Sequence, residues 1–294
     1  GAMESGASEE WSQLTQAEAN ANFDAFAASL GCANLTCLRA IPAFELGRRT
    51  NLGDFRWTAT VDNVELHGRV SDLIAAGEFT RVPMIIGSNQ DEIPAMVRRD
   101  ITEDEYEALV LDQYGASDGA ALLAVYPASD YDSPWFAYQQ LLTDGAFTCT
   151  VIRNARWMAQ HTPTYAYYFT HTSGLAQWIA PALGAFHGTE VAFVMNFERI
   201  FVIEDDHTVA RHFVAYWTNL ARTGDPNTGT LPVPLQWTPY NTAGSDGIHL
   251  VIEPQPYYHE ALKAEQCAVW ETIDGAAAKA ARQRLQAALS ASEL

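Results

Sequence analysis

Two residues of the chain, Glu92 and His187, have side chains and surroundings suited to proton transfer. The segment VPMIIGSNQDE has the form of a buried strand, Val82 to Ile86, running into a polar loop that ends at Glu92. Functional side chains of α/β folds lie just past the carboxyl ends of such strands. His187 stands among small residues in GAFHGTEVAF. A carboxylate that binds a histidine's Nδ1–H fixes its tautomer and stabilises the imidazolium, so the pair could act as an acid and a base.

Both residues also have simpler interpretations. A single histidine is more often a packed or surface group than a catalyst, and Glu92 fits a solvated loop carboxylate as well as a catalytic acid. His187 and Glu190 have the spacing of an H-x-x-E metal pair, but a third ligand at suitable spacing is missing. We therefore predict neither a metal nor a cofactor. The cluster Asp205 to His207 is adequately explained as a helix cap.

A third candidate is Ser117, in the one G-x-S-x-G sequence of the chain, Gly115 to Gly119. A catalytic serine in this motif sits on a sharp turn from a strand into a helix. The preceding residues, Glu105 to Tyr114, have a helical pattern instead. We interpret Ser117 as the N-cap of the next helix and not as a nucleophile.

Elements that could position these residues alternate along the chain. Thr15 and Glu18 form a capping box at the start of a helix that Gly31 can end. Further helices are predicted at 103–115, 119–127, 205–227 and in the last thirty residues, and further strands at 164–171 and 247–256. Strands separated by helices are typical of an α/β architecture.

Composition excludes several functions. The chain has 294 residues, 48% of them apolar, which suits one large or two ordinary domains. Its net charge of -19 makes nucleic acids and anionic membranes poor partners. No apolar run approaches the ~20 residues that span a bilayer. Gly1 to Met3 are typical of a tag remnant followed by a start methionine.

The four cysteines, Cys32, Cys37, Cys149 and Cys267, fit neither a zinc ribbon nor a C-x-x-C redox motif. The first two are close enough in sequence to form a local disulfide, and the other two would close a loop of more than a hundred residues. Spacing alone is equally consistent with free buried thiols.

Six segments occur in an order that resembles the type-B carboxylesterases, a family that includes cholinesterases and fungal lipases. They are MESG (3–6), LGC…CLR (30–39), GEFTRVPMIIGSNQDE (77–92), GAFHGTEVAFV (184–194), YWTNLARTGDPN (216–227) and WTPY (237–240). The resemblance implies an α/β-hydrolase fold, of which residues 4–294 would be the C-terminal portion of a single domain. This portion would contain part of a mostly parallel sheet flanked by helices.

Carried over residue by residue, the resemblance makes Glu92 the acid and His187 the base of a catalytic triad. Ser5 falls where relatives keep a serine that hydrogen-bonds the acid, and Glu190 where cholinesterases keep a buried carboxylate near the site. It also pairs Cys32 with Cys37 and Cys149 with Cys267, which implies a secreted or periplasmic protein.

Two positions depart from the family pattern. Asn63 and Ile93 stand where glycines are usual, which affects local turns and no group of the triad. Trp178 and Phe186 lie near the carried-over segments and could shape a substrate pocket or simply belong to the core.

The resemblance also implies that the catalytic serine, its elbow and the oxyanion hole lie upstream of residue 1. The expected activity is hydrolysis of small carboxylic esters, by a chain that is inactive without this N-terminal portion. The alternatives are a non-catalytic, cholinesterase-like adhesion or binding module and an inactive fragment. The presence of both Glu92 and His187 argues against an adhesion module, which has no need of the pair.

Overall fold

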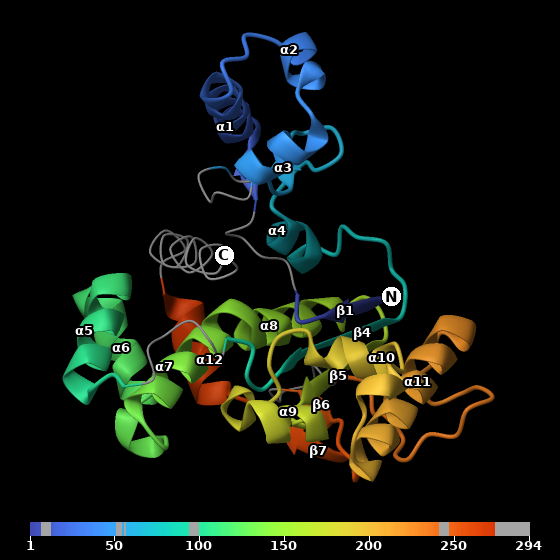
Figure 1. Cartoon of the computed structure of the whole chain (residues 1–294). Coiled ribbons are helices and arrows are strands. Elements are labelled where there is room, and N and C mark those ends of the chain that lie inside the picture. The colour runs from blue at the N-terminus through green and yellow to red at the C-terminus, as the bar shows by residue number, and fades with distance from the viewer. Residues whose placement is uncertain (7–12, 51–54, 56, 94–99, 241–246, 274–294) are drawn as a thin grey trace. The chain divides into compact units, whose positions relative to one another are not determined.

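The strands of the larger part of the molecule form one five-stranded sheet with the order β1-β4-β5-β6-β7 (Figure 1). Its first four strands are parallel, and β7 runs antiparallel to β6. The strands are β1 Ala2–Glu4, β4 Met84–Asn89, β5 Thr164–Phe169, β6 Ile248–Val251 and β7 Tyr257–Glu260. A mostly parallel sheet with flanking helices is the fold class predicted from the sequence, and it is confirmed.

The structure is a computed structural model that describes residues 1–6, 13–50, 55, 57–93, 100–240 and 247–273. Contacts divide the chain into two compact units, one of residues 1–8 and 74–274 and the other of 9–73 and 275–294. Within the described residues, no helix is long and apolar enough to cross a membrane. The assignment of residues 4–294 to one domain stays a prediction.

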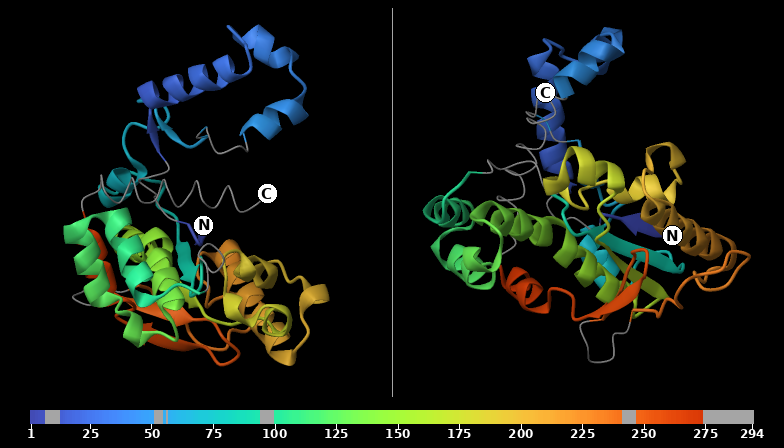
Figure 2. Two further views of the ribbon diagram at one scale, coloured as in Figure 1. Left: turned by 60° about the vertical axis from the view of Figure 1, so that its left-hand side comes forward. Right: turned by 60° about the horizontal axis from the view of Figure 1, so that its bottom comes forward.

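The core of the larger unit forms on both faces of β5. Alternate residues of a strand point to opposite faces. On one face, Tyr165, Tyr167 and Phe169 pack with apolar residues of α11 (Glu204–Thr223). On the other face, Ala166 packs with apolar residues of α8 (Cys149–Met158). Helices therefore cover both faces of the sheet, as Figure 2 also shows.

The other described helices of the larger unit are α5 Glu103–Tyr114, α6 Ala116–Val125, α7 Pro134–Thr143, α9 Gly174–Ile179, α10 Thr189–Val194 and α12 Ala264–Thr272. Helix α4, Val70–Ala75, spans the boundary in sequence between the two units. Shorter turns are η2 Ala128–Asp130, η3 Asp144–Thr148 (a π-helical turn), η4 Pro181–Leu183 and η5 Glu198–Ile200. The helix predicted for the last thirty residues falls mostly on 274–294, outside the described residues.

The predicted cap at Ser117 is wrong. Helix α6 begins at Ala116, and its N-cap is Gly115, which has a φ of 84° and makes no side-chain capping bond. Only a glycine takes this left-handed turn without strain, so the cap falls on Gly115. Ser117 is an exposed residue of the first turn of α6. The helix-turn-helix surroundings that argued against a nucleophile are present as predicted.

The smaller unit contains α1 Gln16–Ser29, α2 Leu35–Ala40, α3 Ala43–Thr50 and the short parallel strands β2 Leu14–Thr15 and β3 Thr60–Val61. The predicted capping box of Thr15 and Glu18 is confirmed. Asn63 adopts a φ of 61°, which asparagine tolerates better than most residues, so the usual glycine turn is retained here.

Both disulfides that the resemblance implied are present. One disulfide joins Cys32 to Cys37, five positions apart in sequence, with a Cα–Cα distance of 5.4 Å. Cys149 and Cys267 join α8 to α12 across 118 positions, with a Cα–Cα distance of 5.1 Å. The open alternative of free buried thiols is thereby excluded.

One histidine of the sheet is buried without polar partners. His249 lies on β6 beside His259 of β7, and its ring packs edge-on against Tyr240 at 5.5 Å between centroids. Neither ring nitrogen hydrogen-bonds any described residue. Burial lowers the pKa of His249 to about 3, and the charge of His259 adds to this effect. His249 is therefore neutral in the folded protein.

This burial predicts a loss of stability in acid. The unfolded chain binds a proton at His249 with an ordinary pKa of about 6.5. Stability from the neutral histidine is thus complete above that pH and is lost as the pH falls toward 3. Linkage gives a loss of about 2 kcal/mol between pH 8 and pH 5. Between pH 8 and pH 5, urea unfolding of His249→Leu should show a correspondingly smaller loss of stability than the parent, whereas the control His67→Gln, at an exposed histidine that does not act on His249, should show the parental loss. An unchanged pH dependence in His249→Leu would contradict this account.

Candidate active site

Glu92 and His187, which the sequence placed together, are in contact in the structure. Glu92 follows β4, and its carboxylate is fully buried. Its Oε1 accepts a hydrogen bond from the backbone N–H of Asn89 at 2.7 Å. Its Oε2 lies 2.7 Å from Nδ1 of His187, within the range of about 2.6–3.2 Å expected for a catalytic hydrogen bond. Both carboxylate oxygens are therefore fixed.

The electrostatics of the pair favour a protonated imidazole. The hydrogen bond that Glu92 accepts from His187 raises the pKa of His187 above its ordinary value. Burial opposes this shift, and the charges of Glu92 and Glu190 add to it. The imidazole is nevertheless 56% exposed. With Nδ1 directed at Glu92, Nε2 is the nitrogen left to take a proton from a nucleophile. Such a pair can act as a general base and then as a general acid.

Two polar side chains of the strand-to-loop segment hold the histidine segment in place. The backbone N–H of Asp91 donates to Ala185 O at 3.1 Å, and the N–H of Ala185 donates to Asp91 Oδ2 at 3.0 Å. Asn89 Nδ2 donates to Phe186 O at 3.0 Å. Residues 89–92 and 184–187 therefore position each other. Neither role was predicted from the sequence. The predicted strand ended at Ile86, whereas β4 continues to Asn89, so only Asp91 lies in the loop that follows.

Gly184 is required for this contact. Its φ is 57°, and a Cβ at this position would lie 2.1 Å from Asp91 Oδ2. A side chain at residue 184 would push Asp91 away and separate the two segments.

The predicted partner of Ser5 is wrong. Ser5 Oγ donates to Glu190 Oε1 at 3.1 Å and not to Glu92. Glu92 has both of its oxygens occupied by Asn89 and His187, whereas Glu190 accepts from Ser5 and from Asn89 Nδ2. Burial raises the pKa of Glu190, the hydrogen bond from Asn89 lowers it, and the charge of Glu92 raises it further. Glu190 is a buried carboxylate beside the pair, at the position predicted for it.

A second histidine–carboxylate pair lacks the access that catalysis needs. His171 Nε2 lies 2.8 Å from Asp206 Oδ1, and Asp206 also accepts from the backbone N–H groups of Gly174 and Val202. His171 is only 8% exposed. Asp206 caps the start of α11, as predicted for that acidic cluster. Exposure of the imidazole therefore distinguishes the candidate site at His187 from this structural pair.

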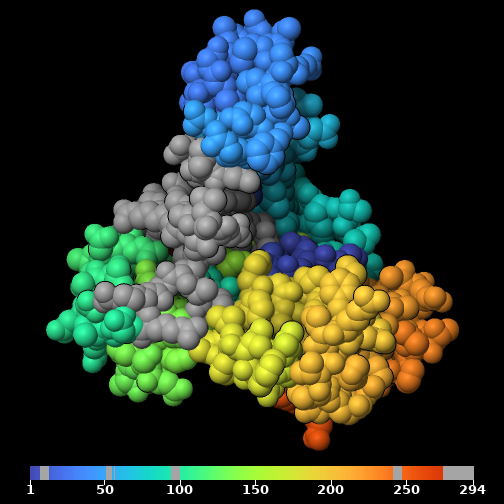
Figure 3. Space-filling view, viewed as in Figure 1, coloured from blue at the N-terminus to red at the C-terminus, as the bar shows by residue number. Residues whose placement is uncertain are grey.

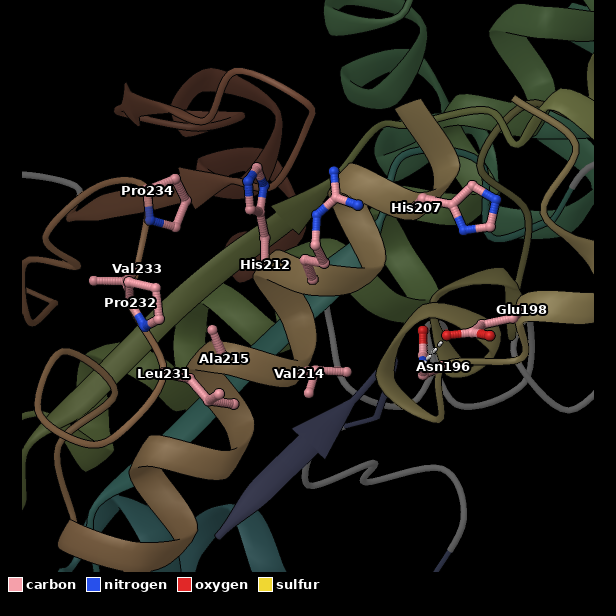
Figure 4. Close-up of a pocket in the computed structure, with 11 residues that line it drawn as sticks. Asn196, Glu198, His207, His212, Val214, Ala215, Leu231, Pro232, Val233 and Pro234 are labelled. Atoms are coloured by element: carbon pink, nitrogen blue, oxygen red, sulfur yellow. Dashed lines mark hydrogen bonds between the residues drawn. The ribbon is translucent and has the colours of Figure 1, made fainter. Parts of the chain in front are cut away.

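A groove beside α11 does not contain the pair. A cavity of about 540 Å³ runs beside α11 (Figure 4). It is lined by Asn196, Glu198, His207, Arg211, His212, Val214, Ala215, Leu231, Pro232, Val233 and Pro234.

The two aromatic residues near the site differ in exposure. Trp178, which could have been a core residue, is 83% exposed, and Phe186 is half-buried. Among the described residues, no group of three or more His, Cys, Asp or Glu side chains could hold a metal ion.

Comparisons with known proteins identify the family that this chain resembles along most of its length. Residues 2–270 match the model of the carboxylesterase family. The chain is similar to a cocaine esterase of Oryctolagus cuniculus, at 28% identity over 71% of this chain and 42% of that protein. It is also similar to acetylcholinesterase 1 of Caenorhabditis elegans (25%, over 74% and 41%) and to an acylcarnitine hydrolase of Rattus norvegicus (27%, over 72% and 40%). The chain thus spans about two fifths of the length of these relatives.

Proposed function

This chain belongs to the carboxylesterase family, and we propose that it contributes Glu92 as the acid and His187 as the base of a Ser-Glu-His triad that hydrolyses carboxylic esters. The observation that carries this proposal is the hydrogen bond between the buried Glu92 carboxylate and Nδ1 of the exposed His187 imidazole. The fold that the family implies, an α/β-hydrolase, is consistent with the mostly parallel sheet.

The proposed reaction uses the imidazole twice. Nε2 of His187 takes the proton of the serine hydroxyl as the serine oxygen attacks the ester carbonyl, while Glu92 holds Nδ1–H and stabilises the imidazolium. The imidazolium then protonates the leaving alcohol, and an acyl-serine forms. His187 next takes a proton from water, whose oxygen attacks the acyl group. The carboxylic acid leaves and the serine regains its proton.

In this proposal the serine elbow and the oxyanion hole lie in an N-terminal portion upstream of residue 1, which is the partner of this chain. Exposed apolar residues close to His187 in sequence support this. Exposed large apolar side chains are concentrated between residues 178 and 203, on both sides of His187 in sequence: Trp178, Ile179, Val191, Met195, Phe197, Ile200, Val202 and Ile203. Figure 3 shows this yellow segment at the surface. Such concentrations of exposed apolar surface mark interaction sites.

The edge of the sheet supports the same partner. Among the described strands, β1 lies at the end of the sheet and pairs only with β4. An uncovered edge strand offers unpaired N–H and C=O groups to another strand. We further propose that residues 4–294 are the C-terminal portion of one α/β-hydrolase domain. The two disulfides support a secreted or periplasmic location.

The test is to express the open reading frame extended upstream of residue 1 and to measure hydrolysis of p-nitrophenyl butyrate. We expect an in-frame Gly-x-Ser-x-Gly elbow and an activity that His187→Gln abolishes. The exposed histidine of β7 provides the matched control His259→Gln, which should retain activity. An extended protein without a serine elbow, or one whose activity survives His187→Gln, would favour the adhesion module or the inactive fragment instead.

We expect the 294-residue chain by itself to hydrolyse no ester at an enzymatic rate. The serine and the oxyanion donors make the largest contributions to acyl transfer, and in this proposal both are supplied by the partner. A fluorophosphonate probe followed by mass spectrometry should therefore label no residue. Labelling at Ser117, in the first turn of α6, would contradict both the assignment of this serine and the proposed division of the site.

A further inference from the structure

The helix that precedes Cys149 widens into a π-helical turn beside the candidate site. This turn, η3, comprises Asp144–Thr148 and separates α7 from α8. π-helical turns are rare in proteins, and those that do occur often lie at functional sites. Phe147 of this turn packs against the ring of His187, with 5.1 Å between centroids and an interplanar angle of 45°.

We propose that Phe147 is a positioning residue for His187. More than half of the imidazole is exposed, and its hydrogen bond to Glu92 fixes only one atom of the ring. A ring held at one atom can still rotate. Contact with Phe147 restricts this rotation and keeps Nδ1 directed at the carboxylate.

The same turn also contacts the segment that carries the acid. Thr143, the last residue of α7, accepts a hydrogen bond at Oγ1 from the backbone N–H of Ile93, at 3.3 Å. Ser88 Oγ of β4 donates to Thr148 Oγ1, also at 3.3 Å. Thr143, directly before the turn, and Thr148, its last residue, are therefore bonded to residues on either side of Glu92 in sequence. The position of Phe147 is set relative to the acid as well as to the base.

A buried ion pair prevents the turn from moving away. Asp144 is fully buried and lies 3.3 Å from Nζ of Lys263, which precedes α12. Asp144 also accepts from the Tyr126 hydroxyl at 3.0 Å and from Gln140 Nε2 at 2.9 Å. Burial raises the pKa of Asp144, and Lys263, together with these hydrogen bonds, lowers it. The satisfied carboxylate fixes the first residue of the turn.

Helix α12 closes on the turn from the other side. A Cβ at Gly145 would lie 2.4 Å from the Trp270 ring, so the ring rests directly on the backbone of the turn. Trp270 Nε1 donates to the Tyr126 hydroxyl at 3.0 Å. The disulfide from Cys149 to Cys267 joins the residue after the turn to α12 covalently. Phe147 therefore projects from a rigid support.

The proposal is tested by the tautomer of His187 in the chain labelled with ¹⁵N-histidine, measured by NMR above the histidine pKa. The parent should hold the Nδ1–H tautomer with a slowly exchanging proton. Phe147→Ala should shift the ratio of tautomers toward Nε2–H by roughly threefold or more and speed exchange of the Nδ1 proton. Phe147→Tyr should restore both. A change in packing alone would not move the tautomer.

The matched control is Phe79→Ala, because Phe79 packs against a different histidine, His161, at 5.9 Å between centroids. It should leave His187 unchanged. A folded Phe147→Ala protein with the parental tautomer ratio and exchange rate would overturn the proposal. The positioning role rests on the proposed function, and Glu92→Gln separates the two. If both Glu92→Gln and Phe147→Ala leave the tautomer ratio unchanged, the proposed acid–base pair is contradicted. If Glu92→Gln changes the ratio and Phe147→Ala does not, only the positioning role is contradicted.

Discussion

In the serine-bearing enzyme proposed above, replacing Glu92 with glutamine should lower kcat by about 10³–10⁴-fold. A glutamine side chain can still hydrogen-bond Nδ1, but it has no charge to stabilise the imidazolium and its amide can select the wrong tautomer. Glu92 is buried and accepts from both Asn89 and His187, so no other group can replace its charge at this place. Steady-state hydrolysis of p-nitrophenyl butyrate measures the effect.

The same variant should change the pH profile in a defined direction. Glu92 raises the pKa of His187, and a base acts only when it is neutral, so activity rises as the pH passes this raised value. In Glu92→Gln the acidic limb of kcat against pH should move to lower pH. The control is Glu103→Gln, in the first turn of α5, which should leave the dependence of kcat on pH unchanged. A Glu92→Gln enzyme that keeps a tenth of the parental kcat would show that Glu92 is not the acid.

Removal of the Cys149–Cys267 disulfide should lower the free energy of unfolding more than removal of the Cys32–Cys37 disulfide. A crosslink that closes a loop of 118 residues removes much more entropy from the unfolded chain than one that closes five. The loop-entropy relation gives roughly 4–5 kcal/mol for the first and about 2 kcal/mol for the second. The double variant Cys149→Ala with Cys267→Ala should therefore unfold at much lower urea concentration than the parent.

The other disulfide provides the control for this prediction. The double variant Cys32→Ala with Cys37→Ala changes the same number of thiols, so urea unfolding of the two variants isolates the effect of loop length. Equal losses, or a larger loss from the short loop, would contradict the entropic explanation and indicate that packing at the bridges dominates.

Much of the fold followed from local patterns. The capping box of Thr15 and Glu18 and the strand before Glu92 were predicted because their signals are local and periodic. The sequence also placed His187 and Glu92 together, through the resemblance of whole segments. The contact itself joins residues 95 positions apart, and no periodicity encodes it.

Other features could not be predicted, for physical reasons. Ser5 bonds Glu190 because its backbone turns to a φ of 48° after β1, and the packing of β1 on β4 decides where its hydroxyl points. Phe147 meets His187 only because the helix widens at Asp144–Thr148. The helical periodicity of the residues before and after that turn gives no sign that the helix widens there. Tertiary contacts decide such details, so they became visible only in the structure.

The glycines on either side of His187 differ in what they allow a protein engineer to change. Gly184 combines a φ of 57° with a ψ of -143°, a conformation essentially confined to glycine, and Asp91 occupies the space of a Cβ. Gly188 has a φ of 81° and a ψ of -4°, and nothing lies within 4 Å of its Cβ position. Asparagine tolerates that left-handed conformation. A directed-evolution library around the base should therefore hold residue 184 constant and place its diversity at residue 188.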